Sequence, residues 1–531
     1  MTAILVETAS PSGLPPELLT MGLKTAINEG SDGQAAEPVC EIRTLLDLFV
    51  RPLELLLLLA AQAILSVMQT TGRAANPRRE NIGLLQLVGQ SLSIGPLVDV
   101  ALFLGIVASL AGAIGPLAVL LASLGMIAFS LVVAFYAVET GGTGGVGDYI
   151  ERAWGPTAGV AVLGIYVLSL IFSGAGGFAI AVGELVANFS AMYMGFGVPW
   201  WAGAGLLACV AWWLNLRGAE AATQAQLVIV SVSVIPFLVT AIAVVIRPEA
   251  ENTLAVFAWN HAHGGDLFAA LLFCILLFGG FETVAALGEE TADPRRNIPI
   301  ALVGTVLLTA VILVFCSYAG TVYYGPDRVA KDWGGVIDGY AVIAHDVVGP
   351  WAAIWIRLAV LVDFTATCIG FSLAASRGIL SLARRGLLPQ ALARTNRRGA
   401  PAAAATAILA AAGLFIAGGL LIPADKRFKT LFVAGTAQAL LLVCVYSGLA
   451  LGALRLMLRS PSRQPVWRWV VFPAASVVPL LALYGTFVPF PEFPERYGLH
   501  AGLLTLGLVI LWAVRGSART IRTGGECPRV G

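Results

Sequence analysis

The chain has 531 residues, of which 58% are hydrophobic and only 12% are charged, with a formal net charge of +1. Charged residues make up about 25% of soluble globular domains, so this composition excludes an ordinary soluble protein and indicates one embedded in a membrane. A net charge so close to zero gives no basis for nucleic-acid binding.

Residues 1–80 differ from the rest and form an N-terminal extension. The segment 1–40 contains several prolines and mixed charges, so we expect it to be disordered. Residues 53–67 are mostly apolar but fall short of the about 20 residues that a membrane span requires. Two interpretations remain open: an interfacial helix, or an extension added upstream of a start at Met68. The segment is not a signal peptide, because it lies far from the N-terminus and lacks a small-residue cleavage site.

From residue 81 onward, apolar segments of spanning length follow one another without a soluble insert. We therefore expect an all-α integral membrane domain over residues 81–516, with about 12 transmembrane helices, and a cytoplasmic tail over 517–531. Arginine-rich loops gather on one side of these spans, and the positive-inside rule then places both termini in the cytoplasm. The expected spans are 82–110, 114–138, 155–187, 198–215, 225–247, 267–290, 299–323, 350–382, 401–422, 430–457, 467–489 and 499–515.

The first span is interrupted by the sequence Ser91-Leu92-Ser93-Ile94-Gly95-Pro96. Proline lacks a backbone donor and disfavours helix at the preceding residue, so Gly95-Pro96 should open the hydrogen-bond ladder. Asp99 follows within one turn. A kink that only aids packing is the alternative, but a second break in the sixth span favours a binding site.

The third span contains Tyr166, whose hydroxyl could reach a substrate carboxylate, followed by small residues at 173–177 that predict close helix packing. The glycine-rich run 141–147 before it matches a dinucleotide fingerprint on paper. It lacks the preceding strand that would give the match meaning, so we reject that interpretation.

The sixth span begins without a charge and is then interrupted by Gly279 and Gly280. Each glycine costs a helix about 1 kcal/mol relative to alanine. In a membrane such a break is tolerated only where the freed backbone lines a cavity or is covered by protein. Because the carboxylate of Glu282 lies beside the break, the stretch is a candidate binding site rather than an anchor.

The eighth span contains Asp363, Thr365 and Thr367. An intramembrane aspartate is rare and is by default a functional hypothesis. The alternative is a packed aspartate whose carboxylate is satisfied by local backbone.

The run FGGFETVAALGEETADPRRNIPIA, from Phe278, resembles the sixth-helix signature of the amino acid–polyamine–organocation transporters, with Asp293 in place of the usual asparagine. A second, independent match is Ala375-Ser376-Arg377 with the Ala-Arg-x-Gly-Leu-Leu-Pro run from Ala383, which resembles the family's eighth helix and the short helix after it. The resemblance covers roughly residues 81–458. It implies the leucine-transporter fold, a five-plus-five inverted repeat with broken helices one and six, here followed by two C-terminal helices.

Broken helices present free N–H groups at the amino ends of their second halves and free carbonyls at the carboxyl ends of their first halves. These ends suit the two charges of a zwitterion, so we expect a secondary active transporter of amino acids or related amines that works by alternating access. The alternatives are a transporter of polyamines or another organic cation, or a channel-like protein. The expected substrate-binding residues are Ser93, Ile94, Gly95, Phe278, Gly279, Gly280, Phe281 and Tyr166.

The coupling ion, H⁺ or Na⁺, is the second ligand that we expect. Some family members carry a lysine in the fifth helix that substitutes for sodium, but the fifth span here has none. In the fold that the resemblance implies, helices one and eight are neighbours. The candidate coupling residues are therefore Asp363, Thr365, Thr367 and Asp99, of which Asp99 could instead face a substrate ammonium.

The spans carry neither a nucleophile–base pair nor a metal constellation, so we expect no enzyme activity, cofactor or metal. The seven cysteines are scattered, and the histidines fall in expected outer loops or at a helix edge. The expected partners are a small molecule, the coupling ion and the lipid bilayer of the cell membrane, while the oligomeric state is left open. The histidines are His261, His263, His345 and His500.

Overall fold

The computed structural model describes residues 82–94, 99–142, 145–247, 252–258, 264–334, 338–459, 464–488 and 490–522. All of them belong to the second of two compact units into which the chain divides, Met1–Leu58 and Leu59–Gly531. The predicted extension 1–80, with its segment 53–67, therefore lies outside the described residues, as do Gly95, His261 and His263.

The described residues are almost entirely helical, and their one β feature is an isolated bridge between Ile82 and Thr291. The helices before the sixth span are α3 (Leu84–Leu92), η1 (Asp99–Phe103), α5 (Leu104–Ala111), α6 (Gly115–Glu139), α7 (Val146–Trp154), α8 (Pro156–Leu170), η3 (Ile171–Gly177), α9 (Phe178–Tyr193), α10 (Trp200–Arg217) and α11 (Ala219–Ile246). The helices that follow are α12 (Gly264–Leu276), η6 (Phe281–Glu290), α13 (Pro294–Tyr324), α14 (Val329–Asp332), α15 (Gly339–Val347), α16 (Pro350–Arg384), α17 (Ala402–Gly419), α18 (Ala424–Arg427), α19 (Thr430–Arg459), α20 (Arg468–Gly485) and α21 (Glu495–Arg522).

Ten of the described helical segments are long and apolar enough to span a membrane. The prediction of about 12 spans differs from this number for two reasons. The segment Asp99–Glu139 contains α5 and α6 end to end and therefore covers parts of two predicted spans. The helix α10 occupies the predicted span 198–215 without being among the ten. The prediction of an all-α membrane protein is confirmed.

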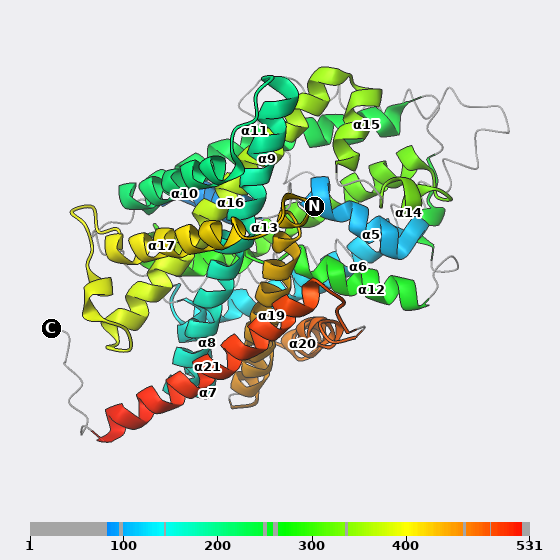
Figure 1. Ribbon diagram of the computed structural model, residues 1–531. Coiled ribbons are helices and arrows are strands. Elements are labelled where there is room, and N and C mark those ends of the chain that lie inside the picture. Colours follow the sequence, from blue (N-terminus) through cyan, green and yellow to red (C-terminus); the bar gives the residue numbers. More distant parts are fainter. Residues whose placement is uncertain are drawn as a thin grey trace, which may run out of the picture. The chain divides into compact units, whose positions relative to one another are not determined.

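Burial divides the helices into a central set and a peripheral set. The most apolar window of α16 is 78% buried, and α16 packs against α8, α9, α10 and α11 (Figure 1). The corresponding windows of α17, α20 and α21 are only 28% buried. Side chains that are apolar and exposed suit a lipid surface, so the peripheral helices face the bilayer and the central ones hold the interior. Figure 1 shows α20 and α21 beside α19, against which both pack.

Both predicted helix breaks are present. The helix α3 ends at Leu92, with Ser93 and Ile94 outside it, and the next described residues, Asp99–Phe103, form one π-helical turn. The helix α12 ends at Leu276, and the chain continues through a turn into the 3₁₀-helix η6. A 3₁₀ run of ten residues is unusually long, and such stretches in the middle of a helix often mark a hinge.

The two broken helices are joined at both ends of their common stretch. Near the start of α3, the Ile82 N–H donates to Glu290 O at 3.2 Å, and the Ala292 N–H donates to Ile82 O at 3.0 Å. Near its end, the Ser91 hydroxyl donates to Phe281 O at 3.0 Å. Backbone acceptors freed by the breaks are thus satisfied within the protein, as a membrane interior requires.

Candidate functional site

The break of the sixth span is organised around the fully buried carboxylate of Glu282. The Tyr446 hydroxyl of α19 donates to Glu282 Oε2 at 2.5 Å. The Gly280 N–H donates to the same oxygen at 3.2 Å and to the Tyr446 hydroxyl at 3.4 Å. The Thr283 hydroxyl donates to Gly280 O at 2.7 Å. The backbone donor of Gly280, which we expected to be free for a substrate, is therefore occupied by a carboxylate of the chain itself.

Gly280 adopts a backbone conformation that side chains avoid, with φ of 104°. A Cβ atom at this position would lie 2.5 Å from Cγ2 of Ile94, so the two breaks touch where glycine leaves room for the isoleucine. At Gly279 the nearest side-chain atom to such a Cβ is Leu442 Cδ2, at 3.1 Å. Gly280 is therefore the more restrictive of the two glycines.

Tyr166 of α8 is buried beside Glu282 and interacts electrostatically with its carboxylate. The Tyr166 hydroxyl and the Glu282 carboxylate therefore face one another in the interior. Both residues line a cavity of about 810 Å³ that η6 shares with α16 and with the loop before α7. Tyr166 thus lies near the predicted site, next to a carboxylate of the protein.

The end of α3 is held by side chains from two neighbouring helices. The Thr367 hydroxyl of α16 donates to Ser93 O at 3.0 Å. The amide of Gln226, on α11, donates to Ser93 Oγ at 2.7 Å and to Ala366 O at 3.1 Å. These acceptors could have held a cation, and a neutral hydroxyl and a neutral amide satisfy them instead.

Sequence reasoning did not assign Gln226 or Tyr446 to the site. A polar amide inside an apolar span was the available signal for Gln226. Tyr446 gave none, because an aromatic residue in a membrane helix is as often a packing residue.

A second cavity, of about 420 Å³, is lined by residues of both breaks and of α12, α16 and α19. Four of the predicted residues line it: Ile94, Asp99, Gly279 and Thr367. Its volume is within the usual range for small-molecule sites. Phe278, Gly280 and Phe281 are buried at the break without lining either cavity.

Asp99 and Asp363 bring two carboxylates into the interior. Asp99 is only 6% exposed, and its Oδ2 has no hydrogen-bond partner in the described residues. Asp363 on α16 is fully buried and interacts electrostatically with Asp99. The Thr365 hydroxyl donates to Leu361 O of its own helix at 3.1 Å, so of the two threonines only Thr367 reaches across to α3.

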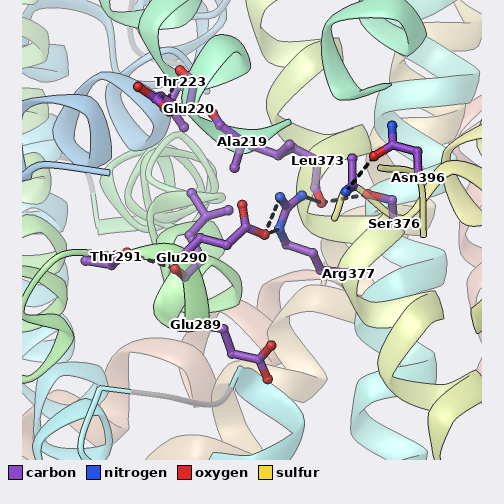
Figure 2. Close-up of polar contacts among 12 residues, drawn as sticks. Ala219, Glu220, Thr223, Glu289, Glu290, Thr291, Leu373, Ser376, Arg377 and Asn396 are labelled. Carbon is purple, nitrogen blue, oxygen red and sulfur yellow. Dashed lines mark hydrogen bonds and ion pairs between the residues drawn. The ribbon is translucent and has the colours of Figure 1, made fainter. Parts of the chain in front are cut away.

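The 810 Å³ cavity is bridged by an ion pair between η6 and α16. The Arg377 guanidinium donates to Glu290 Oε1 through Nε at 2.9 Å and Nη2 at 2.6 Å, and through Nη1 to Leu373 O at 3.1 Å. Figure 2 shows Arg377 facing Glu290, whereas the side chain of Glu289 points away. Glu289 forms an ion pair with Arg384 instead, with 3.8 Å between Glu289 Oε2 and Arg384 Nη1.

A family model described as amino acid permease matches residues 87–514. The chain is 25% identical over 461 residues to the gamma-aminobutyric acid permease of Escherichia coli, covering 82% of this chain and 95% of that one. It is 24% identical over 387 residues to the branched-chain amino acid permease BcaP of Lactococcus lactis, covering 68% and 77%. With the polyamine transporter RMV1 of Arabidopsis thaliana it shares 25% identity over 328 residues, covering 60% and 61%.

The match spans both broken helices and the helices packed around them, and it confirms the resemblance to the amino acid–polyamine–organocation transporters. The described helices are those of a protein that crosses the membrane many times. The chain therefore belongs to the amino acid permease family of multi-pass membrane proteins.

Proposed function

We propose that the protein is a secondary active transporter of amino acids or related amines that works by alternating access. The observation that carries this proposal is the position of the two cavities. One is lined by Ile94 and Gly279, and the other by Tyr166 and Glu282. Ile94 of the first lining packs against Gly280, and Glu282 of the second lining accepts the Tyr446 hydroxyl. Two hollows on a shared break in paired broken helices suit a site that is reached from each side in turn.

The proposed substrate site includes residues whose position the structure describes and one, Gly95, that lies outside the described residues. Backbone atoms freed by the breaks would contact the substrate, while buried aromatic side chains would close the site. Its residues are Ser93, Ile94, Gly95, Phe278, Gly279, Gly280, Phe281 and Tyr166.

For the coupling ion we propose Asp363, with Thr365, Thr367 and Asp99 as further candidates. Gln226 satisfies the acceptors at the end of α3 without charge, so H⁺ or Na⁺ coupling requires another group in the interior. Asp363 is a fully buried carboxylate one turn from Thr367, whose hydroxyl contacts Ser93 O. An ionisable residue at this depth supports a role in ion coupling.

We further propose that the transporter resides in the cell membrane with both termini in the cytoplasm. The basis is the positive-inside rule, applied to the arginine-rich loops 384–398 and 455–468. Relatives described as permeases and transporters support transport rather than enzymatic turnover.

The test is counterflow in proteoliposomes. Vesicles preloaded with an unlabelled amino acid or amine are diluted into medium that contains a labelled trace of the same compound. A carrier accumulates the label transiently above equilibrium, whereas a channel gives no accelerated exchange. Absence of an overshoot across a screen of amino acids and amines, with correctly inserted protein, would contradict the proposal.

A further inference from the structure

Two short π-helical stretches lie against the 420 Å³ cavity. The first is Asp99–Phe103, which reopens the first span after its break, and the second is Ile171–Gly177, within the third span. π-Helical turns make up well under about 1% of residues in globular proteins and occur frequently at functional sites. Both stretches contribute a polar residue to the cavity, Asp99 and Ser173.

These two polar residues are buried and lack partners. The Ser173 side chain is 1% exposed, and its hydroxyl, like Asp99 Oδ2, has no hydrogen-bond partner in the part of the chain that the structure describes. Buried polar atoms in native proteins are nearly always hydrogen-bonded, so an unsatisfied pair facing one cavity points to a ligand that supplies donors. A hydroxyl can accept one such hydrogen, and a carboxylate can accept several.

The charged side chains among the described residues that line the cavity are all acidic. None of the described residues that line it is a lysine, arginine or histidine, while Asp99 and Glu495 contribute carboxylates. Asp363 adds a further carboxylate within electrostatic range of Asp99. Such a hollow attracts a cation, and a ligand carboxylate would meet repulsion without a cationic side chain to offset it.

Three described backbone donors beside the breaks are already bonded within the chain. The Gly280 N–H is bonded to Glu282 and Tyr446. The N–H groups of Ser93 and Ile94 donate to Gly89 O at 3.0 Å and to Ser91 O at 3.2 Å. These three described N–H groups are therefore already used within the chain.

The remaining lining suits an alkyl chain. It is largely aliphatic and aromatic, and it includes the rings of Phe103, Phe178, Phe273, Phe371 and Phe432. Aromatic faces also stabilise a cation that lies over them.

We infer that this cavity binds the ammonium group of an amine that carries no carboxylate, with Asp99 and Ser173 as its hydrogen-bond acceptors. The inference rests on the proposed transport function and narrows it to one substrate class. The ammonium donates to Asp99 Oδ2 and Ser173 Oγ, and the alkyl chain lies against the phenylalanine rings. Asp363 interacts electrostatically with Asp99 and strengthens the negative field.

The experiment compares pairs of ligands that differ only by the carboxylate. Leucine is matched with 3-methylbutylamine, and lysine with 1,5-diaminopentane. Each is tested as a competitor in counterflow and as a stabiliser of the full-length protein in thermal unfolding. In each pair we expect the amine to act at concentrations at least about tenfold lower than the amino acid, because only the amino acid brings a carboxylate against the acidic lining.

Variants then test the two acceptors. Asp99→Asn keeps the size and removes the charge, and we expect it to weaken amine competition about tenfold or more. Ser173→Ala should weaken it less, by about threefold, because a neutral acceptor is lost. Asp425→Asn, an exposed charge outside the cavity, is the matched control and should leave the preference unchanged. If Asp99→Asn does not fold, the comparison of ligand pairs on the unaltered protein still decides the question.

The outcomes separate the two proposals. Counterflow in which leucine and lysine compete as well as or better than their amines would overturn this inference and leave transport standing. An amine preference that survives in Asp99→Asn and Ser173→Ala alike would overturn the assigned acceptors. Absence of exchange across the wider screen of amino acids and amines would overturn the transport proposal, and this inference with it.

Discussion

The sharpest consequence of the break geometry concerns Gly280. Replacing it by alanine places a Cβ on a residue with φ of 104°. Holding a non-glycine residue in such a region costs about 1–3 kcal/mol. The new Cβ would also lie 2.5 Å from Cγ2 of Ile94, and forcing extra volume into a packed interior costs about 1–3 kcal/mol. The two terms together come to about 2–6 kcal/mol.

This strain falls on the contact between the two breaks. Because 1.4 kcal/mol corresponds to about a factor of ten, we expect Gly280→Ala to lower substrate exchange at least tenfold. Counterflow measures the loss, and thermal unfolding in detergent shows how much of the strain appears as lost stability. Gly304→Ala in α13 is the control, since no atom lies within 4 Å of its added Cβ.

A double variant separates the two terms. Ile94→Ala removes the atom that the new Cβ would meet, so Gly280→Ala combined with Ile94→Ala should destabilise less than the sum of the two single changes. The backbone strain would remain. Exchange and stability equal to wild type in Gly280→Ala would refute the reasoning, because neither strain nor contact would then matter at this position.

Three further outcomes are expected. Asp363→Asn should abolish concentrative uptake while exchange of preloaded substrate survives, and uptake with unchanged ion and pH dependence would make Asp363 a packing residue. Arg377→Gln should lower the free energy of unfolding by about 1–2 kcal/mol, since charged hydrogen bonds are lost but the Glu290 side chain is 36% exposed, and thermal unfolding tests this. An impermeant thiol reagent added outside cells should label a cysteine at the exposed Asp327 and spare one at the exposed Arg398, and the reverse pattern would overturn the proposed orientation.

The sequence predicted what depends on composition and local backbone chemistry. The apolar spans follow from the need to satisfy every backbone group inside a bilayer, and the breaks follow from Gly95-Pro96 and Gly279-Gly280. It did not predict that η6 is a 3₁₀-helix or that π-helical turns present Asp99 and Ser173. These features depend on packing between helices that are distant in the sequence. Such packing produces no periodic pattern of residues from which it could be predicted.

Contacts that side chains make between helices could not be predicted from the sequence either. Gln226 contacts Ser93 across more than a hundred residues of chain, and Tyr446 contacts Glu282 in the same way. Each lies in an apolar span, where its spacing from other polar residues does not indicate which helix it contacts. The sequence showed a carboxylate at the break of the sixth span. It did not show that this carboxylate accepts the hydrogen bond of the Gly280 N–H.

The double attachment of α3 to the sixth span has a mechanical consequence. The two segments are hydrogen-bonded at both ends and form a single unit, which we call the bar. Ile82 bonds to Glu290 and Ala292 at one end, and Ser91 bonds to Phe281 at the other. Moving one segment without the other would break these hydrogen bonds. The chain enters this bar at Ile82, directly after the N-terminal extension. A displacement of Ile82 therefore acts directly on the end of η6, through its hydrogen bonds to Glu290 and Ala292.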